Sequence, residues 1–251
     1  QLQHLIFVIF PEFLTVLKIS TKTARYFIKH FTTPEKIYAL GVDSVSQIVK
    51  KLSRGQLGPD RAKQLHAAAG DSVGITEGKQ SIVFEIEHLV GRIEAEDQFI
   101  DRLEQQMRVF LQQIPYSRNM LSIRGLGEVT VAGLIGEVAD FTKFDTICEV
   151  MKLAGLDLYE ISSGKHRGQR RISKRGRPLM RKLLFFAAIN AVKYKGIMHA
   201  KYQHMLNRGK VKMKALIAIS RKLLAIIFAI VRDRTKYVEN YNDSSHYQIA
   251  A

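Results

Sequence analysis

Apolar residues recur at intervals of three and four along most of the chain, a spacing that is typical of helices packed on one face. Strict alternation of apolar and polar residues, which would indicate strands, is nearly absent. Thr33-Pro34-Glu35 and Gly58-Pro59-Asp60 are helix starts, because proline is favoured in the first helical turn. The pattern therefore predicts an all-α protein. We expect short helices over residues 1–73 and further helices at about 143–154, 178–193, 197–206 and 211–232.

The longest periodic segment is residues 76–116. Its apolar positions follow a heptad seam, and the flanking positions carry charges of both signs. The seam has one polar position, Glu96, and otherwise consists of Ile82, Ile86, Leu89, Ile93, Ile100, Leu103, Met107, Phe110 and Ile114. This spacing predicts a coiled-coil helix that ends at Pro115 and drives self-association. A long helix packed on its own domain is the alternative.

The segment LSIRGLGEVTVAGLIGEV, residues 121–138, is similar to a helix-hairpin-helix element. Gly125 and Gly127 permit a tight turn between two helices. The backbone N–H groups of such a turn, with the N-terminus of the next helix, can bind a phosphate. A plain turn between helices is the alternative.

Charge is concentrated in one part of the chain. The net charge is +16, yet no acidic residue lies between Glu160 and Asp233, where Lys165 to Arg232 include 19 Lys or Arg. Such a block favours a polyanionic partner, with nucleic acid first and an anionic membrane second.

The membrane interpretation is the weaker one. Arg221 and Lys222 interrupt the apolar C-terminal run, which is too short on either side to span a bilayer. We therefore expect a cytoplasmic protein without a membrane partner. The apolar positions of that run fit one buried helical stripe: Leu216, Ile219, Leu223, Ile226, Ile227 and Ile230.

Disulfide and metal chemistry have little support in the residues. Cys148 is the single cysteine, and we expect it to be buried in a helix. The eight histidines show no metal-ligand spacing with acidic residues, so no metal site is expected within the chain.

The segment ISSGKHRGQRRISKRGRPLMRK, residues 161–182, contains nine Lys or Arg and no acid. A serine hydroxyl attacks a phosphodiester only if its proton is removed and cations stabilise the developing charge. Ser162 and Ser163 precede such cations, but a turn in front of a basic helix is the commoner interpretation of the residues alone. The candidate phosphate-binding residues here are Lys165, Arg167, Arg170, Arg171, Lys174, Arg175 and Arg181.

Three longer motifs together carry a family resemblance: GLGEVTVAGLIGEVADFTKF, LAGLDLYEISSGKHRGQRRISKRGRPLMRKLLFFAA and KYQHMLNRGKVKMKALIAISRKLLAIIFAIV. Their order and spacing closely resemble a family of bacterial insertion-sequence transposases. Members of that family have an N-terminal RuvC-like DEDD domain and a C-terminal serine domain, and are guided by a bridge RNA. The resemblance implies that Ser163, with Ser162 in reserve, attacks DNA and forms a phosphoserine link.

The resemblance also implies a domain organisation. Residues 1–75 would be a helical region after a RuvC-like domain that precedes Gln1, residues 76–118 the coiled coil, residues 119–236 the serine transposase domain and residues 237–251 a polar tail. Mg²⁺ would be bound by the preceding domain, and DNA, a guide RNA and further copies of the chain would be the partners. The chain by itself would then bind DNA without cleaving it. A non-catalytic helical nucleic-acid-binding module is the alternative function.

Overall fold

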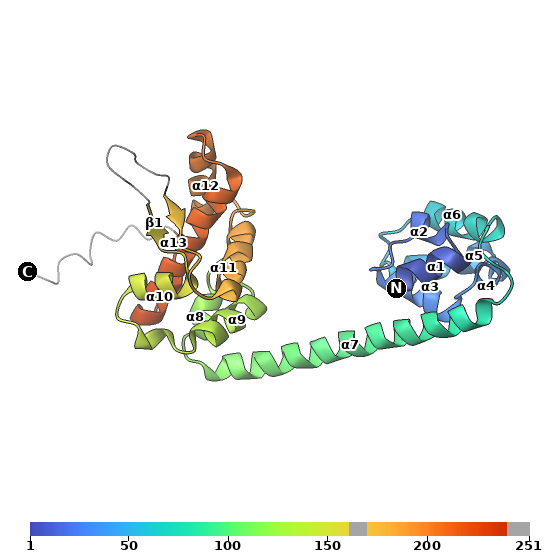
Figure 1. The fold of residues 1–251 in the computed structure, drawn as a ribbon, viewed down its shortest axis with the longest axis horizontal. Helices are drawn as coiled ribbons and strands as arrows, with labels where there is room; N and C mark the ends of the chain where they lie inside the picture. Colours follow the sequence, from blue (N-terminus) through green and yellow to red (C-terminus); the bar gives the residue numbers. More distant parts are fainter. Residues whose placement is uncertain (161–169, 240–251) are drawn as a thin grey trace, which may run out of the picture. The chain divides into compact units, whose positions relative to one another are not determined.

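The structure is a computed structural model that describes residues 1–160 and 170–239. Thirteen α-helices, one 3₁₀ helix and a hairpin of two short strands account for the regular elements of these residues (Figure 1). The prediction of an all-α protein is confirmed. The chain divides into an N-terminal unit, Gln1–Arg102, and a C-terminal unit, Leu103–Ala251. The division falls within the long helix α7 (Lys79–Gln113).

The N-terminal unit packs six short helices and the first part of α7 around one apolar core. Phe10, Phe13 and Phe27 are among its fully buried side chains, and α7 contributes Ile86 and Val90. Both predicted proline starts are confirmed, since Pro34 and Pro59 each open a helix. The short helices are α1 (Leu2–Ile9), α2 (Phe13–Val16), α3 (Lys22–His30), α4 (Pro34–Ala39), α5 (Gly41–Leu52) and α6 (Pro59–Gly70).

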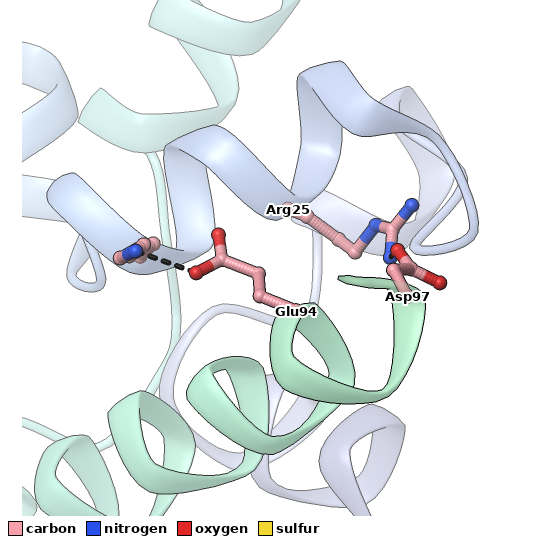
Figure 2. A network of polar contacts seen from close by, with 4 residues as sticks. Arg25, Glu94 and Asp97 are labelled. Atoms are coloured by element: carbon pink, nitrogen blue, oxygen red, sulfur yellow. Dashed lines mark hydrogen bonds and ion pairs between the residues drawn. The ribbon is translucent and has the colours of Figure 1, made fainter. Parts of the chain in front are cut away.

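Ion pairs join the elements of this unit. Arg25 of α3 pairs with Asp97 of α7, and Lys29 pairs with Glu94 at 2.6 Å between nitrogen and oxygen (Figure 2). Lys79, the first residue of α7, lies 2.6 Å from the Glu35 carboxylate of α4. The hydrogen bond from Lys79 is the main cause that lowers the pKa of Glu35 from 4.5 to about 2. Each of these three cations therefore has an acidic partner on another helix.

The helix α7 confirms the long helix expected over residues 76–116, and it ends at Gln113, before Pro115. The first part of the seam packs on the N-terminal unit, where Ile86 is fully buried. The middle of the seam faces solvent, with Ile100 50% exposed and Phe110 64% exposed. Ile114 at the far end of the seam packs against the core of the C-terminal unit. Packing within the units thus accounts for both ends of the seam, and the pairing of the open face with another helix stays a prediction.

The C-terminal unit is organised around α13, which packs against α11, α12, α10 and α8. Ile219, Leu223, Ile227 and Ile230 of α13 are buried in its core, so the predicted apolar stripe is core and not a membrane face. The elements are α8 (Ser117–Leu121), α9 (Glu128–Val138), η1 (Phe141–Lys143), α10 (Ile147–Ala154), β1 (Leu158–Tyr159), β2 (Arg171–Ile172), α11 (Pro178–Ala191), α12 (Ile197–Asn207) and α13 (Lys212–Asp233).

In the part of the chain that the structure describes, no helix combines the length and the apolar character needed to cross a membrane.

The prediction of a buried thiol at Cys148 was wrong, because this side chain is exposed. Val150, Met151 and Ala154 form the buried face of α10, and Cys148 lies on another face because successive helical residues are turned by about 100°.

Candidate nucleic-acid interface

The end of α10 is a turn that glycine makes possible. Gly155 has φ +63 and follows the last helical residue. Its N–H donates to the carbonyl of Lys152 at 2.8 Å, and the N–H of Leu156 donates to the carbonyl of Met151 at 2.9 Å. This pair of bonds is a Schellman motif. Leu156 is fully buried and anchors the exit of the chain from the helix.

The basic segment 174–181 folds back onto this helix end. The backbone N–H of Lys174 donates to the Gly155 carbonyl at 3.0 Å, and that of Arg177 donates to the Leu153 carbonyl at 2.9 Å. The guanidinium Nη1 of Arg181 donates to the Ala154 carbonyl at 3.0 Å. Carbonyls that a helix leaves unpaired at its C-terminus are thereby satisfied. The segment is consequently held in one place by α10.

Gly176 allows the close approach. Its φ is +145, a region that other residues rarely adopt, and a Cβ added there would overlap the Leu153 carbonyl oxygen and lie 2.7 Å from the Gly155 nitrogen. Any side chain would push the segment off the end of α10. The neighbours Arg175 and Arg177 are therefore fixed by a backbone contact.

The strands β1 and β2 form an antiparallel hairpin beside this junction. Tyr159 is opposite Arg171, and Leu158 is opposite Ile172. Past the last pair, the N–H of Ser173 donates to the Asp157 carbonyl at 2.9 Å, and the Ser173 hydroxyl donates to the Asp157 carboxylate. Beyond the last residue pair, the two chain segments are therefore joined by a side-chain hydrogen bond as well as by a backbone hydrogen bond.

A hollow of about 510 Å³, which we name the hairpin hollow, lies at the foot of this hairpin. Among the described residues, the side chains of Lys152 and Arg175 form no ion pair. The two cations and the Tyr159 phenol can donate to the nonbridging oxygens of a phosphodiester, whereas the Ser173 hydroxyl already donates to Asp157. The hollow is lined by Lys152, Asp157, Tyr159, Ser173 and Arg175.

The predicted basic residues have different roles in the structure. Arg175 lines the hairpin hollow. Arg171 and Lys174 are exposed. Arg170 is paired with Glu160 at 2.9 Å, on a side chain that is 75% exposed. Ser162, Ser163, Lys165 and Arg167 lie outside the described residues.

Arg181 and the two hairpin glycines have structural contacts. Arg181 is half-buried and caps α10 through the Ala154 carbonyl. Gly125 has φ +97, and a Cβ there would lie 2.6 Å from the Ala191 nitrogen of α11. Gly127 precedes α9 and is open to solvent. The first residue of α9, Glu128, is paired with Arg108 at 2.6 Å, so this helix N-terminus already faces a carboxylate.

Sequence reasoning missed Lys152, Asp157, Tyr159 and Ser173 as residues of the hollow. Lys152 belongs to the last turn of α10, and nothing in its local sequence distinguishes it from any other helical lysine. The exposed alternation of Asp157 and Tyr159 before the Ser-Ser-Gly segment was a weak strand signal. Only pairing with β2 gives those two residues a shared side of the hairpin.

Metal binding has no fitting set of residues in the described part of the chain. No three of its His, Cys, Asp and Glu residues are grouped to hold an ion. Asp157 is the carboxylate of the hairpin hollow, and it accepts a hydrogen bond from the Ser173 hydroxyl. One carboxylate in that setting does not fit Mg²⁺, which prefers several oxygen ligands and retained water.

Comparison with known proteins gives the hollow a family context. Residues 117–203 match the transposase IS116/IS110/IS902 family. Over 135 residues the chain is 29% identical to a protein of Streptomyces coelicolor described as an insertion element IS110 uncharacterized 43.6 kDa protein. That match covers 54% of this chain and 33% of the relative, so the chain spans about a third of the length of the curated relative it matches. Residues 117–203 of the C-terminal unit are thus similar to the transposase IS116/IS110/IS902 family, and the hairpin hollow lies within this matched segment.

Proposed function

We propose that this chain is part of a DNA transposase that cleaves and rejoins strands through a serine–phosphodiester intermediate. The observation that carries the proposal is the hairpin hollow, where Lys152 and Arg175 flank a strand pair. The residues that connect the two strands in the sequence include Ser162 and Ser163. The sequence therefore places two hydroxyls between Lys152 and Arg175, cations of the kind that an attack on phosphorus requires.

The proposed step is a balanced transesterification. The Oγ of Ser163 bonds to phosphorus, the bond from phosphorus to the 3′ oxygen breaks, and the serine proton passes to that oxygen, which leaves as a 3′ hydroxyl. One phosphodiester replaces another, so the reverse reaction can rejoin a strand without an external energy source. Arg175 and Lys152 would bind the nonbridging oxygens as charge develops on them.

Substitution of the serine tests the chemistry in the full-length parent protein with its guide RNA and Mg²⁺. Ser163→Ala should abolish a covalent protein–DNA adduct and leave DNA affinity nearly unchanged, because one hydroxyl adds little beside many phosphate contacts. Denaturing gels with labelled DNA report the adduct, and Ser162→Ala is the matched control. An adduct lost only in Ser162→Ala moves the attack to Ser162, and one that survives the double variant rules out both serines. A non-catalytic binding module would keep its whole function in Ser163→Ala.

Substitution of the cations tests the hollow in the 251-residue chain. Arg175→Gln with Lys152→Gln should weaken binding of a duplex oligonucleotide in fluorescence anisotropy. Lys143→Gln is the control, because Lys143 of η1 is exposed and does not line the hollow. Equal affinities of the two variants would contradict a phosphate site at the hairpin hollow.

We propose that a second copy of the chain covers the exposed seam of α7, as the heptad spacing indicates. Ile100 and Phe110 are on the seam and exposed, whereas Phe84 is 74% exposed and off the seam. Ile100→Asp with Phe110→Asp should convert a dimer or larger species to a monomer in sedimentation at tens of micromolar, and Phe84→Asp should not. A wild-type monomer would contradict this assembly. We also propose that the protein binds a guide RNA, on the basis of the family resemblance alone.

A further inference from the structure

A second hollow lies between α12 and α13, and its residues are not those of the hairpin hollow. It measures about 490 Å³, within the range of about 300–1,000 Å³ that ligand pockets occupy. Its lining combines apolar side chains with the exposed cations Lys201 and Lys222. We name it the helical hollow. The apolar part of the lining is Ala200, Met205, Ala218 and Ile219.

The electrostatic setting of the helical hollow favours an anion. Lys201 of α12 and Lys222 of α13 interact with each other, which lowers the pKa of Lys201, and burial lowers it further. An adjoining hollow of about 450 Å³ shares His204 and Met205 and adds Arg208 and Lys210. No acidic residue occurs in the sequence of either helix before Asp233. Two neighbouring ammonium groups without a carboxylate repel each other, and a bridging phosphate would relieve that repulsion.

The apolar side chains of the lining favour single-stranded nucleic acid over a duplex as the polyanion that binds here. A duplex presents phosphates and sugars outward and keeps its bases stacked, so it has nothing to place on thioether and methyl groups. An unpaired nucleotide has a flat base that can lie on such a surface while its phosphate meets the lysines. The thioether of Met205 is a favourable partner for an aromatic ring.

We propose that the helical hollow binds one nucleotide of single-stranded DNA, with its phosphate between Lys201 and Lys222 and its base against Met205, Ala218 and Ile219. The proposal rests on the proposed function only for the choice of DNA as the polymer. A DNA strand that is separated from its complementary strand during cleavage would then bind to the C-terminal unit at the helical hollow, and not at the hairpin hollow.

The test compares single and double strands with the 251-residue chain. The probes are a labelled oligodeoxyuridine, an oligouridine of equal length and a DNA hairpin duplex with the same number of phosphates. Lys201→Gln with Lys222→Gln should weaken oligodeoxyuridine binding on the order of tenfold, as expected for charge-assisted contacts. The slope of log affinity against log salt should become shallower by about 0.7 for each phosphate that no longer meets a cation. Duplex binding should change less.

A steric variant separates the base contact from charge. Ala218→Leu fills the hollow without a change of charge, so it should weaken oligodeoxyuridine binding and leave duplex binding unchanged. Lys193→Gln with Lys195→Gln removes two cations of the same acid-free block outside the hollow and is the control for charge. Circular dichroism establishes that each variant is folded. Photocrosslinking of a 4-thiothymidine strand, mapped by mass spectrometry, should label the peptide that contains Met205.

Several outcomes would overturn the proposal. Equal weakening of single-strand and duplex binding would make the lysines a general phosphate surface. Unchanged binding in Ala218→Leu would remove the base from the hollow. Tighter binding of oligouridine than of oligodeoxyuridine, abolished in the double lysine variant, would make RNA the ligand. The double variant Arg175→Gln with Lys152→Gln removes the cations of the hairpin hollow. If this variant binds duplex DNA as tightly as the wild type, the result contradicts the proposed function and leaves the proposal for the helical hollow untouched.

Discussion

The two units of the chain differ in their balance of charge. Residues 1–102 carry 13 Lys or Arg and 12 Asp or Glu, whereas residues 103–251 carry 26 and 11. In the N-terminal unit, pairs such as Lys29–Glu94 and Lys79–Glu35 join separate helices. In the C-terminal unit, the basic segment is held by backbone bonds to the end of α10, and the side chains of Lys174 and Arg175 are exposed.

The comparison distinguishes charged side chains that stabilise the fold from charged side chains that remain exposed to solvent and can bind a ligand. An ion pair between helices fixes the position of both side chains and neutralises them. A segment anchored by its backbone and by one guanidinium, that of Arg181, keeps its other cations for solvent or a ligand. We propose that the C-terminal unit provides the polyanion-binding surface, whereas ion pairs of the N-terminal unit join its own helices.

The largest expected effect is the salt dependence of DNA binding. If roughly 6 to 10 cations engage phosphates, affinity should fall on the order of 10³- to 10⁵-fold between about 50 and 200 mM salt, because bound cations release condensed counterions. Fluorescence anisotropy with a labelled duplex measures the slope. A nearly flat response would mean that the excess charge of the C-terminal unit does not contact nucleic acid.

Matched charge variants sharpen the same comparison. Arg171→Glu with Arg175→Glu should weaken DNA binding and flatten the salt slope, because both side chains are exposed in the C-terminal unit. Arg54→Glu with Lys63→Glu makes the same change of charge in the N-terminal unit, at two positions outside the acid-free block. Equal effects of the two pairs would show that net charge alone, and not its placement, governs binding.

A smaller effect is expected at the backbone anchor. Gly176→Ala should destabilise the C-terminal unit by at least about 1–3 kcal/mol, because the φ of Gly176 is unfavourable for alanine and the added methyl meets the end of α10. Gly136→Ala is the control, since this glycine within α9 has open space and alanine there should stabilise by about 0.5–1 kcal/mol. Urea denaturation followed by circular dichroism measures both. A neutral Gly176→Ala would mean that the segment is not held against α10.

The smallest effect concerns an ion pair of the N-terminal unit. The pKa of Glu35 is lowered from 4.5 to about 2 by Lys79, so this carboxylate stabilises the fold fully above about pH 4.5, and that contribution is lost as the pH falls toward 2. The side chain is 57% exposed, which limits the contribution to less than about 1 kcal/mol. Urea denaturation of the wild type and Glu35→Gln should differ most near neutral pH and converge in acid. A difference that is independent of pH would contradict a role of the charge.

Local sequence signals predicted the helices well. Pro34, Pro59 and Pro178 each open a helix, and the helices predicted at 197–206 and 211–232 are α12 and α13 with ends shifted by one residue. These signals depend on neighbours within one or two turns, which is why the sequence is sufficient for them. The buried stripe of α13 was predicted for the same reason, because its spacing repeats on one face.

Local signals were insufficient where one residue type serves several purposes. Arg175 and Arg181 belong to the same basic run, yet one lines the hairpin hollow and the other caps a helix 27 residues away in the sequence. Gly125 was predicted to hold phosphate, and its conformation and contact with Ala191 also meet a packing requirement. Cys148 was expected to be buried from its apolar neighbours, but its helical face is exposed.

The sequence by itself determined the helices, their order, the position of the charge excess and the resemblance to insertion-sequence transposases. These depend on composition and on spacing within one element. The tertiary structure decided that Lys152, Asp157, Tyr159, Ser173 and Arg175 share one hollow and that Lys201 and Lys222 meet across α12 and α13. Such sets are made by contacts between elements distant in sequence, and the backbone bonds of segment 174–181 to α10 set which cations face solvent.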